Sequence, residues 1–345
     1  MAREFWDYRR AGVDLDKHRL MHREALRAVE ETAEHLGLDI NGLGGYAAWF
    51  RLGERRLALH VDGVGTKTLV LEAVNKLWVA GWDCVAMNVN DLAVAGFKPL
   101  VLVDYIAMPS SDEKAFAEIM RGLVVAAKRA RVALIGGETA ILPDLAKGFD
   151  VVCTVLGEKL SNNYQGLAKP NDILLGVESN GLHANGYSLA RKIIRQRLGD
   201  YNAVYNGINL GQELSKPTHI YSSLVLHAIK KGLVNAAAHI TGGGFTKLGR
   251  ILGERLHAEI HAPEPPPVFR ALMELGNVEP REMYRVFNMG VGLVLSAPEN
   301  SVDELQELVR SHGFRSFIIG RVKTGSPRII INTPWGDVVE YKVQP

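Results

Sequence analysis

Cysteine is scarce in this chain of 345 residues, which contains only Cys84 and Cys153. The two lie far apart in the sequence, and neither belongs to a CxxC pair of the kind that binds zinc. We therefore expect neither a disulfide framework nor a zinc site. The same scarcity is typical of a protein of the reducing cytoplasm.

An excess of charge of one sign is also missing. The chain has 40 Lys and Arg against 38 Asp and Glu, a formal net charge of +2, so it has no large positive field to hold nucleic acid. The basic cluster of Lys128, Arg129 and Arg131 is then more simply interpreted as a solvated helix face than as a binding patch. We expect no nucleic-acid partner.

Long apolar segments are absent as well. The longest stretch without Asp, Glu, Lys or Arg is 232–246, which has 15 residues and falls short of the roughly 18 apolar residues of a membrane span. The first ten residues mix acids and bases, unlike a secretory signal. We expect no membrane partner and a cytoplasmic location. With 47% hydrophobic and 23% charged residues, the composition is that of a globular protein, and its length favours two domains.

Hydrophobic periodicity and turn residues predict alternating helices and strands in the first half. Asp83 is a plausible N-cap, and Ser110 with Glu113 forms a capping box. The predicted helices cover 16–36, 68–96 with a break near Gly81, and 110–130; the predicted strands cover 57–61, 99–106, 132–135 and 149–156.

The second half repeats this mixture after a polar, turn-rich stretch at 160–170. We take that stretch as the domain junction and predict an N-terminal domain over 1–165 and a C-terminal domain over 166–345. The predicted strands of the second half cover 172–177, 292–295 and 317–322, and its helices cover 187–197 and 217–231. The fold class is α+β or α/β.

The segment Asp62-Gly-Val-Gly-Thr-Lys67 directly follows a predicted strand. Glycines let backbone N–H groups approach phosphate oxygens, a lysine adds a positive charge, and a carboxylate at the edge of a loop can bind Mg2+. The spacing matches neither GxxxxGK[ST] nor GxGxxG, so an ordinary tight turn is an equally good interpretation. Asp91, Asp104 and Glu138 are further carboxylates on separate predicted elements, although each alone is more simply a cap or a surface acid.

Two further loops carry groups that could act in catalysis. The first, 179–188, reads SNGLHANGYS; its His183 could transfer a proton or donate to an oxyanion, and the helix that follows could receive a phosphate. A histidine that only caps the turn is the simpler alternative. The second loop, 239–244, reads HITGGG and could let backbone approach a ligand or simply be flexible.

Taken in order, these motifs strongly resemble the aminoimidazole ribonucleotide synthetase family, also called phosphoribosylformylglycinamidine cyclo-ligases. The likeness runs from about residue 8 to residue 320. The motifs that carry it are GVDLD (12–16), GLGGY (42–46), DGVGTK (62–67), ND (90–91), DY (104–105), GGETA (136–140), SNGLHANGYSL (179–189), HITGGG (239–244) and NVEPREMYRVFNMGVG (277–292).

The resemblance implies a homodimer in which each N-terminal domain contributes strands to a shared β-barrel, with a layered αβ C-terminal domain covering an ATP cleft. It implies ATP as co-substrate, Mg2+ held by Asp62 and Asp91, and catalytic roles for Lys67, Asp91 and His183. Substrate-binding residues would be His183, Asn185 and Ser188. Nucleotide- and phosphate-binding residues would be Gly44, Gly45, Asp62, Gly63, Gly65, Thr66, Lys67, Gly136, Gly137, Glu138 and Thr139.

The implied reaction closes a ring in formylglycinamidine ribonucleotide, within purine biosynthesis, and releases ADP and phosphate. Oxide is a poor leaving group, so phosphorylation of the formyl amide oxygen would allow the amidine nitrogen to attack. Relatives of the same architecture fit less well: selenophosphate synthetase needs a reactive Cys or selenocysteine before its glycine loop, and the hydrogenase-maturation dehydratase needs a C-terminal cysteine. A nucleotide-binding scaffold without turnover is the alternative from another functional class.

Overall fold

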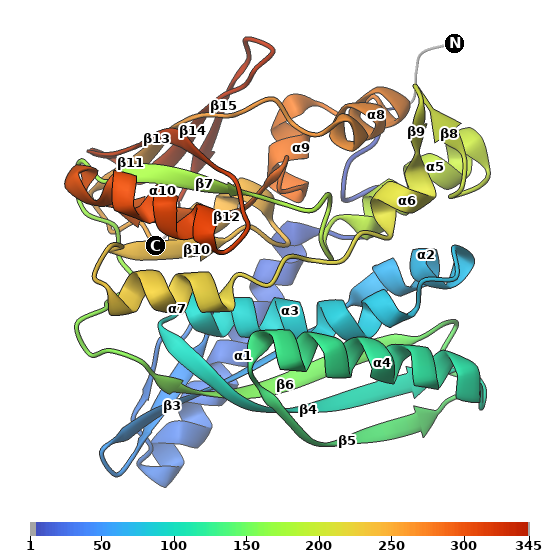
Figure 1. Cartoon of the computed structure of the whole chain (residues 1–345), viewed down its shortest axis with the longest axis horizontal. Helices are drawn as coiled ribbons and strands as arrows, with labels where there is room; N and C mark the ends of the chain where they lie inside the picture. Colours follow the sequence, from blue (N-terminus) through green and yellow to red (C-terminus); the bar gives the residue numbers. More distant parts are fainter. Residues whose placement is uncertain (1–4, 344–345) are drawn as a thin grey trace.

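The computed structural model describes residues 5–343, apart from the side chains of residues 15, 16, 18 and 19. Two sheets with their own helices divide the chain into halves, which lie one above the other in Figure 1. The predicted mixed α/β class is confirmed. In the described part, no helix is long and apolar enough to cross a membrane.

The N-terminal half is built on a six-stranded sheet of order β1-β2-β3-β6-β4-β5, antiparallel except for the pair β4 and β5. Three predicted strands are confirmed as β3, β4 and β6, each somewhat longer than expected. The strands are β1 (Ile40–Asn41), β2 (Ala48–Leu52), β3 (Arg55–Gly63), β4 (Phe97–Met108), β5 (Ala133–Ile141) and β6 (Asp150–Lys159).

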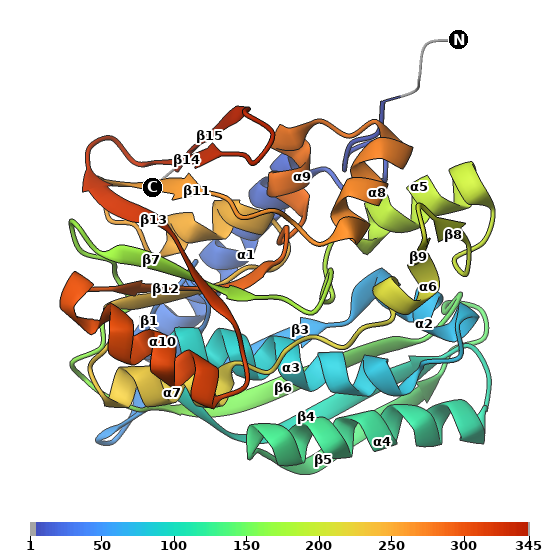
Figure 2. The same ribbon diagram turned by 45° about the horizontal axis from the view of Figure 1, so that its top comes forward.

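Within the part of the chain that the structure describes, helices pack against one face of this sheet. The α1 helix (Leu15–Leu36) confirms the first predicted helix, and η1 (Gly65–Lys67) and α2 (Thr68–Ala73) lead from β3 toward α3 (Trp78–Val94). α3 and α4 (Glu113–Ala130) pack together against the sheet (Figures 1 and 2). The other face is open, and large apolar side chains at least 38% exposed lie on its strands: Leu59, Val61, Val103, Tyr105 and Ile135.

The C-terminal half contains a seven-stranded sheet of order β10-β12-β7-β13-β11-β14-β15. Its strands are β7 (Ile173–Glu178), β10 (Ala236–His239), β11 (Leu256–His261), β12 (Val291–Ala297), β13 (Ser316–Thr324), β14 (Arg328–Asn332) and β15 (Val338–Lys342). Its helices are α5 (Tyr187–Leu198), α6 (Leu210–Leu214), α7 (Ser222–Lys230), α8 (Pro267–Gly276), α9 (Pro280–Val286) and α10 (Val302–Ser311). The short elements are β8 (Val204–Tyr205), β9 (Ile208–Asn209), η2 (Gly244–Arg250) and η3 (Glu299–Ser301).

Each half has its own hydrophobic core, and α3 joins the two. This helix contacts α4 and the first sheet on one side, and α7 and β10 of the second half on the other. Polar side chains of α3 tie the halves together: Trp82 Nε1 donates to the carbonyl of Thr218 at 2.7 Å, and Asn90 Nδ2 to that of His219 at 2.8 Å. Residues on α3 are therefore positioned by both halves.

The predicted helix break near Gly81 is wrong, as is the N-cap at Asp83. The break lies at 74–77, and both residues are inside α3. Gly81 is a packing residue, because a Cβ there would lie 2.0 Å from the carbonyl oxygen of Ile119 on α4. Asp83 is fully buried in the helix interior, where Lys67 compensates its charge.

Two other local predictions need correction. The N-cap of α4 is Asp112, whose carboxylate accepts from the N–H groups of Lys114 and Ala115, so the capping box of Ser110 and Glu113 is wrong. The strand expected over 132–135 is the nine-residue β5, an exposed edge strand that contains the whole GGETA motif.

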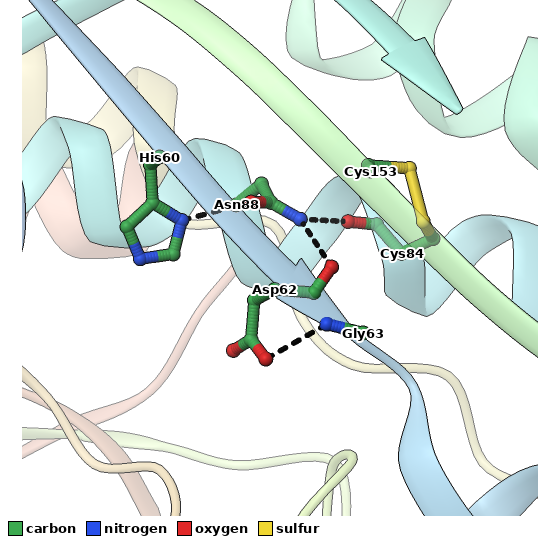
Figure 3. The surroundings of a disulfide bond; sticks show 6 residues. All are labelled: His60, Asp62, Gly63, Cys84, Asn88 and Cys153. Carbon is green, nitrogen blue, oxygen red and sulfur yellow. Dashed lines mark hydrogen bonds between the residues drawn. A yellow bond between two sulfur atoms is a disulfide. The ribbon is translucent and has the colours of Figure 1, made fainter. Parts of the chain in front are cut away.

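The two cysteines form a disulfide, contrary to the prediction (Figure 3). Cys84 lies on α3 and Cys153 on β6, and both are fully buried. Their separation of 69 residues concealed a contact that arises only when α3 packs on the sheet. Disulfides occur inside the cells of hyperthermophilic archaea and bacteria, so this bond does not exclude the predicted cytoplasmic location, which stays a prediction.

Candidate functional site

The DGVGTK and SNGLHANGYS loops meet in the structure. Thr66 Oγ1 lies 3.3 Å from Ser188 Oγ, and Lys67 Nζ donates to the carbonyl oxygen of His183 at 2.7 Å. The first loop follows β3, and the second precedes α5 of the other half. Two motifs about 120 residues apart in the sequence therefore share one junction between the halves.

Lys67 is enclosed at this junction and has no exposed surface. Besides the His183 carbonyl, its Nζ contacts Asp83 Oδ2 at 2.5 Å and the carbonyl of Lys216 at 2.7 Å. Burial lowers the pKa of Lys67, and the negative charge of Asp83 opposes that shift. All three ammonium protons have protein acceptors, so a contact with phosphate would require Lys67 to give up one of them.

Asp91 lies between two histidines. Its Oδ1 is 2.6 Å from His239 Nδ1, and its Oδ2 is 3.4 Å from His60 Nε2. Burial alone would raise the pKa of Asp91, but its hydrogen bonds with the two histidines outweigh burial and hold this pKa well below its usual range. Asp91 is therefore an ionised carboxylate with both oxygens in use.

The amide of Asn88 defines the proton positions on His60 (Figure 3). Asn88 Nδ2 donates to the carbonyls of Asp62 and Cys84 at 3.1 and 2.8 Å, so its Oδ1 faces His60 Nδ1 at 2.8 Å as an acceptor. His60 Nδ1 then carries a proton, and Nε2 faces the Asp91 carboxylate. Although burial opposes it, the hydrogen bond and charge of Asp91 raise the pKa of His60, which favours an imidazolium.

The side-chain amide of Asn90 similarly defines which ring nitrogen of His239 donates and which accepts. Asn90 Oδ1 accepts from the backbone N–H of Tyr221 at 2.7 Å, so Asn90 Nδ2 is the group that lies 3.4 Å from His239 Nε2. Nε2 of His239 is then an acceptor, and its Nδ1 donates to Asp91.

His183 is fully buried and has an unpartnered ring nitrogen. Its Nε2 accepts from the backbone N–H of Asn180 at 3.1 Å, which places the proton of the neutral ring on Nδ1. Among the described residues Nδ1 has no hydrogen-bond partner. Burial, aided by nearby His219, His239 and Lys67, lowers the pKa of His183 well below its ordinary value. His183 is therefore a neutral donor with an unused N–H group.

The HITGGG loop approaches the other end of the same motif. A Cβ on Gly242 would lie 3.1 Å from Asn185 Oδ1, and a Cβ on Gly244 would lie 2.3 Å from the carbonyl oxygen of Tyr284. Glycine is thus required at 244 for close packing, and its positive φ of 51° adds to the constraint. The buried Nδ2 of Asn185 has no partner among the described residues, so it is available to a ligand.

Asp62 and Asp91 differ in how well they fit Mg2+. Asp62 Oδ1 accepts from the N–H of Gly63 at 2.8 Å, and its Oδ2 makes no hydrogen bond with the described residues. In residues 5–343, no group of three His, Cys, Asp or Glu side chains could hold a metal ion alone. Asp62 therefore fits an ion held mainly by phosphates, whereas Asp91 would first have to release a histidine.

The glycine-rich segment 42–45 lies near the HITGGG loop. Tyr46 Oη, directly after it, donates to the carbonyl of His239 at 3.3 Å. Gly44 and Gly45 are exposed, and Gly44 has a φ of 76°. The segment can therefore border a ligand at this edge of the site.

The GGETA motif is not brought to these loops within one chain. Cross-strand pairing places Asp62, Cys153, Asp104 and Gly137 in one row across β3, β6, β4 and β5, so β5 is three strands away from β3. Glu138 is exposed, and its one hydrogen bond within residues 5–343 is accepted from the backbone N–H of Thr139, at 2.8 Å. Gly136, Gly137, Glu138 and Thr139 all lie on the exposed edge strand.

Sequence reasoning missed three residues of this site: His60, Asn88 and Lys247. Burial lowers the pKa of Lys247 to about 8, with Arg250 adding to the shift, while Asp62 and Asp91 oppose it. His60 is two residues before Asp62 on β3, and Asn88 is one turn before Asp91 on α3. Their proximity to the predicted residues was the only available signal.

Two adjacent family signatures match the chain. The N-terminal domain of the AIR synthase related proteins matches residues 44–158, and the C-terminal domain of the same proteins matches residues 169–332. The two matches fall on the two halves described above.

Curated relatives match over almost their whole length. A phosphoribosylformylglycinamidine cyclo-ligase of Saccharolobus solfataricus is 40% identical over 93% of this chain and 94% of its own. Proteins of the same name from Thermococcus kodakarensis and Methanobrevibacter smithii are 41% and 37% identical, over 93% and 97% of this chain and 96% and 99% of theirs.

Solved structures share the fold at lower identity. The HypE-HypF complex has a TM-score of 0.65 at 18% identity, covering 92% of this chain and 99% of the matched one. AaThiL complexed with AMPPCP and TMP has a TM-score of 0.62 at 17% identity, covering 92% and 94%. T. maritima PurL complexed with ADP has a TM-score of 0.60 at 17% identity, covering 89% of this chain and 46% of PurL.

Proposed function

Because the chain belongs to the phosphoribosylformylglycinamidine cyclo-ligase family, we propose that it closes the imidazole ring of aminoimidazole ribonucleotide from formylglycinamidine ribonucleotide, with ATP converted to ADP and phosphate. The structural observation that carries the proposal is the junction of the DGVGTK and SNGLHANGYS loops at Thr66 and Ser188. A nucleotide site and a substrate site on different halves need such a junction to exchange a phosphoryl group.

The chemistry requires activation of the formyl amide oxygen. In the proposed reaction, that oxygen attacks the γ-phosphorus of ATP and ADP leaves; the amidine nitrogen then attacks the formyl carbon, and the oxygen departs as inorganic phosphate. Phosphoryl transfer depends mainly on positioning and on stabilisation of charge. ATP binding is supported by the nucleotides named with two fold relatives, AMPPCP with AaThiL and ADP with T. maritima PurL.

We assign the phosphates to the loop after β3. The N–H groups of Gly65 and Thr66 would contact phosphate oxygens, and Asp62, whose Oδ1 accepts from the N–H of Gly63, would hold Mg2+ through its other oxygen, Oδ2. When bound, Mg2+ would neutralise charge on the phosphate oxygens. We propose that Asp91 positions His60 and His239. It would not bind Mg2+ directly, because both of its carboxylate oxygens already contact these histidines.

The residue better placed than Lys67 to bind the phosphates of ATP is then Lys247. It interacts electrostatically with Asp62 and Asp91 and is only partly enclosed, whereas all three protons of Lys67 have acceptors. We propose that Lys67 fixes the junction of the two loops and that Lys247 meets the incoming phosphate charge.

We assign the formylglycinamidine side to His183, Asn185 and Ser188. Neutral His183 would donate from Nδ1 to the amide oxygen, because that N–H group is buried without a partner. Asn185 Nδ2 is the second unpartnered donor of the same loop. Two unsatisfied donors within three residues of each other suit a substrate rich in amide and phosphate oxygens.

We propose that the active protein is a homodimer. The open face of the N-terminal sheet exposes Val61, Val103 and Tyr105, which a second copy would cover. Pairing of these faces would form the barrel that the family resemblance implies. In such a dimer, Glu138, which is exposed on β5, would border the active site of the second copy.

The proposed function is tested with purified protein, ATP and formylglycinamidine ribonucleotide, measuring aminoimidazole ribonucleotide and ADP together. We expect equal amounts of both, and His183→Ala should lower turnover while nucleotide affinity measured by calorimetry stays close to that of the parent. Strong ATP binding without ring closure would favour the scaffold alternative. Loss of ATP binding in a folded His183→Ala protein would move His183 to the nucleotide site.

A further inference from the structure

A basic cavity lies outside the candidate site, where the two halves meet at the start of β4. Its volume is about 570 Å³. α7 contributes several lining residues and α10, which lies beside α7 at the left of Figure 2, contributes Ser311. The lining residues are Lys98, Pro99, Arg129, Ala130, Arg131, Leu160, Ile220, Ser223, Leu226, His227, Lys230, Ser311, His312 and Phe314.

The charge of this lining is one-sided. It contains four lysines and arginines and two histidines, and it contains no Asp or Glu. The whole chain, by contrast, has nearly equal numbers of acids and bases, 38 against 40. A random surface of this protein would therefore bring carboxylates to such a group of cations.

Three of the four cations have no acidic partner among the described residues, whereas Lys98 lies opposite Glu158 on β6 and attracts its carboxylate without forming a salt bridge. Lys98, Arg129, Arg131 and Lys230 are exposed and make no salt bridge within the described residues. Exposed Arg121, on the same helix as Arg129, is by contrast paired with Glu118. Four like charges around one cavity repel each other, and an anion relieves that repulsion.

The cations come from separate elements that the fold brings together. Lys98 is on β4, Arg129 and Arg131 lie at the end of α4, and Lys230 ends α7. The helix dipole accounts for cations at the ends of α4 and α7 taken singly, but not for Lys98 or for the convergence of these elements on one cavity. The sequence-based interpretation of the cluster at 128–131 as a solvated face therefore leaves this convergence unexplained.

Apart from Ser223 and Ser311, the remaining lining is apolar and aromatic. Leu226 and Phe314 are partly exposed there, and Pro99, Ala130 and Ile220 are buried behind them. The ring of Phe314 is 5.0 Å from that of His219, which in turn is 6.0 Å from that of His183. The ring of His219 thus lies between the cavity and the candidate site, and no residue of the site's loops lines the cavity.

We propose that this cavity binds a small phosphorylated molecule, with its phosphate held by Lys98, Arg129, Arg131 and Lys230 and its less polar part against Leu226 and Phe314. The volume lies in the range of small-molecule sites, and a concave site favours such a ligand over a polynucleotide, which an open basic stripe would suit better. Arginine pairs are suited to phosphate because the guanidinium donates two parallel hydrogen bonds.

The test uses inorganic pyrophosphate as the probe, titrated by calorimetry into the full chain in low salt with AMPPCP present at saturation to occupy the proposed nucleotide site. We expect one pyrophosphate per chain, with an affinity that falls as salt is raised. Arg129→Gln/Arg131→Gln should weaken it by about tenfold or more. Lys98→Gln/Lys230→Gln, which changes the cations contributed by β4 and α7, should do the same.

A matched control variant also loses two positive charges, but at residues that do not line the cavity. Lys128→Gln/Lys342→Gln removes two exposed cations, one of them next to Arg129, and should keep pyrophosphate affinity within about twofold of the parent. Equal affinity in the parent and both cavity variants, or equal loss in the control, would overturn the proposal. So would binding of a single-stranded oligonucleotide that depends on these residues without any binding of pyrophosphate.

Discussion

Lys67 Nζ and Asp83 Oδ2 are 2.5 Å apart, and neither side chain has any exposed surface. Lys67 comes from the loop after β3, and Asp83 is on α3. Asp83 Oδ1 also accepts from the backbone N–H of Thr218 at 2.7 Å, so the pair links three segments of the two halves.

We predict that Lys67→Met lowers the free energy of unfolding by about 3 to 5 kcal/mol, because it leaves the Asp83 carboxylate buried without its partner. Lys67→Met/Asp83→Leu should recover part of this loss, since both charges are then gone. Urea denaturation measures both variants. If Lys67→Met kept the stability of the parent and lost only ATP affinity, Lys67 would be a phosphate ligand as the sequence predicts.

We predict that the stability contributed by His60 depends on pH. The pKa of His60 is raised, so its contribution is complete below the unfolded value of about 6.5 and is lost as the pH rises through the folded pKa. The pKa of Asp91 is lowered, so its share is present above about 3.9 and is lost in stronger acid. His60→Gln should therefore be most destabilising between about pH 4 and 6.5.

Urea denaturation of the parent and His60→Gln at pH 5.5 and pH 9.5 tests this dependence, with exposed His35→Gln on α1 as the control. An equal loss of stability at the two pH values would mean that His60 is neutral in the folded protein.

We predict that the disulfide stabilises the protein by about 2 to 4 kcal/mol, because it closes a long loop between α3 and β6. Cys84→Ala/Cys153→Ala should lower the midpoint of thermal unfolding accordingly. Alkylation in denaturant followed by mass spectrometry should label neither cysteine before reduction and both after it. Two labelled cysteines in unreduced protein would show that the bond does not form.

We predict a dimer in solution, formed through the open face of the N-terminal sheet. Val61→Lys should produce monomers of about 38 kDa in light scattering, because a charge at the centre of an apolar interface is costly to bury. Val338→Lys, at an equally exposed position on β15, is the control and should remain dimeric. A parent protein that is monomeric at micromolar concentration would refute the prediction.

Long buried strands and amphipathic helices could be predicted from the sequence, and α1, β3, β4, β6, β7 and α5 were. The predictions for Gly81 and Asp83 were wrong because Gly81 packs against α4 and Asp83 pairs with Lys67, and no local sequence pattern reveals either contact. The disulfide escaped for the same reason. In the site, the meeting of the loops at 66 and 188 follows the family motifs, but the enclosure of Lys67 and the two histidines on Asp91 are tertiary facts.

The most direct test of the proposed reaction follows the formyl oxygen. Formylglycinamidine ribonucleotide labelled with ¹⁸O in its formyl carbonyl is converted by the protein with unlabelled ATP, and the products are analysed by mass spectrometry. If ATP activates the amide oxygen, every ring closed should release one labelled inorganic phosphate, and ADP should stay unlabelled. Label in water with unlabelled phosphate would contradict this account, because ATP would then drive a step other than the departure of that oxygen.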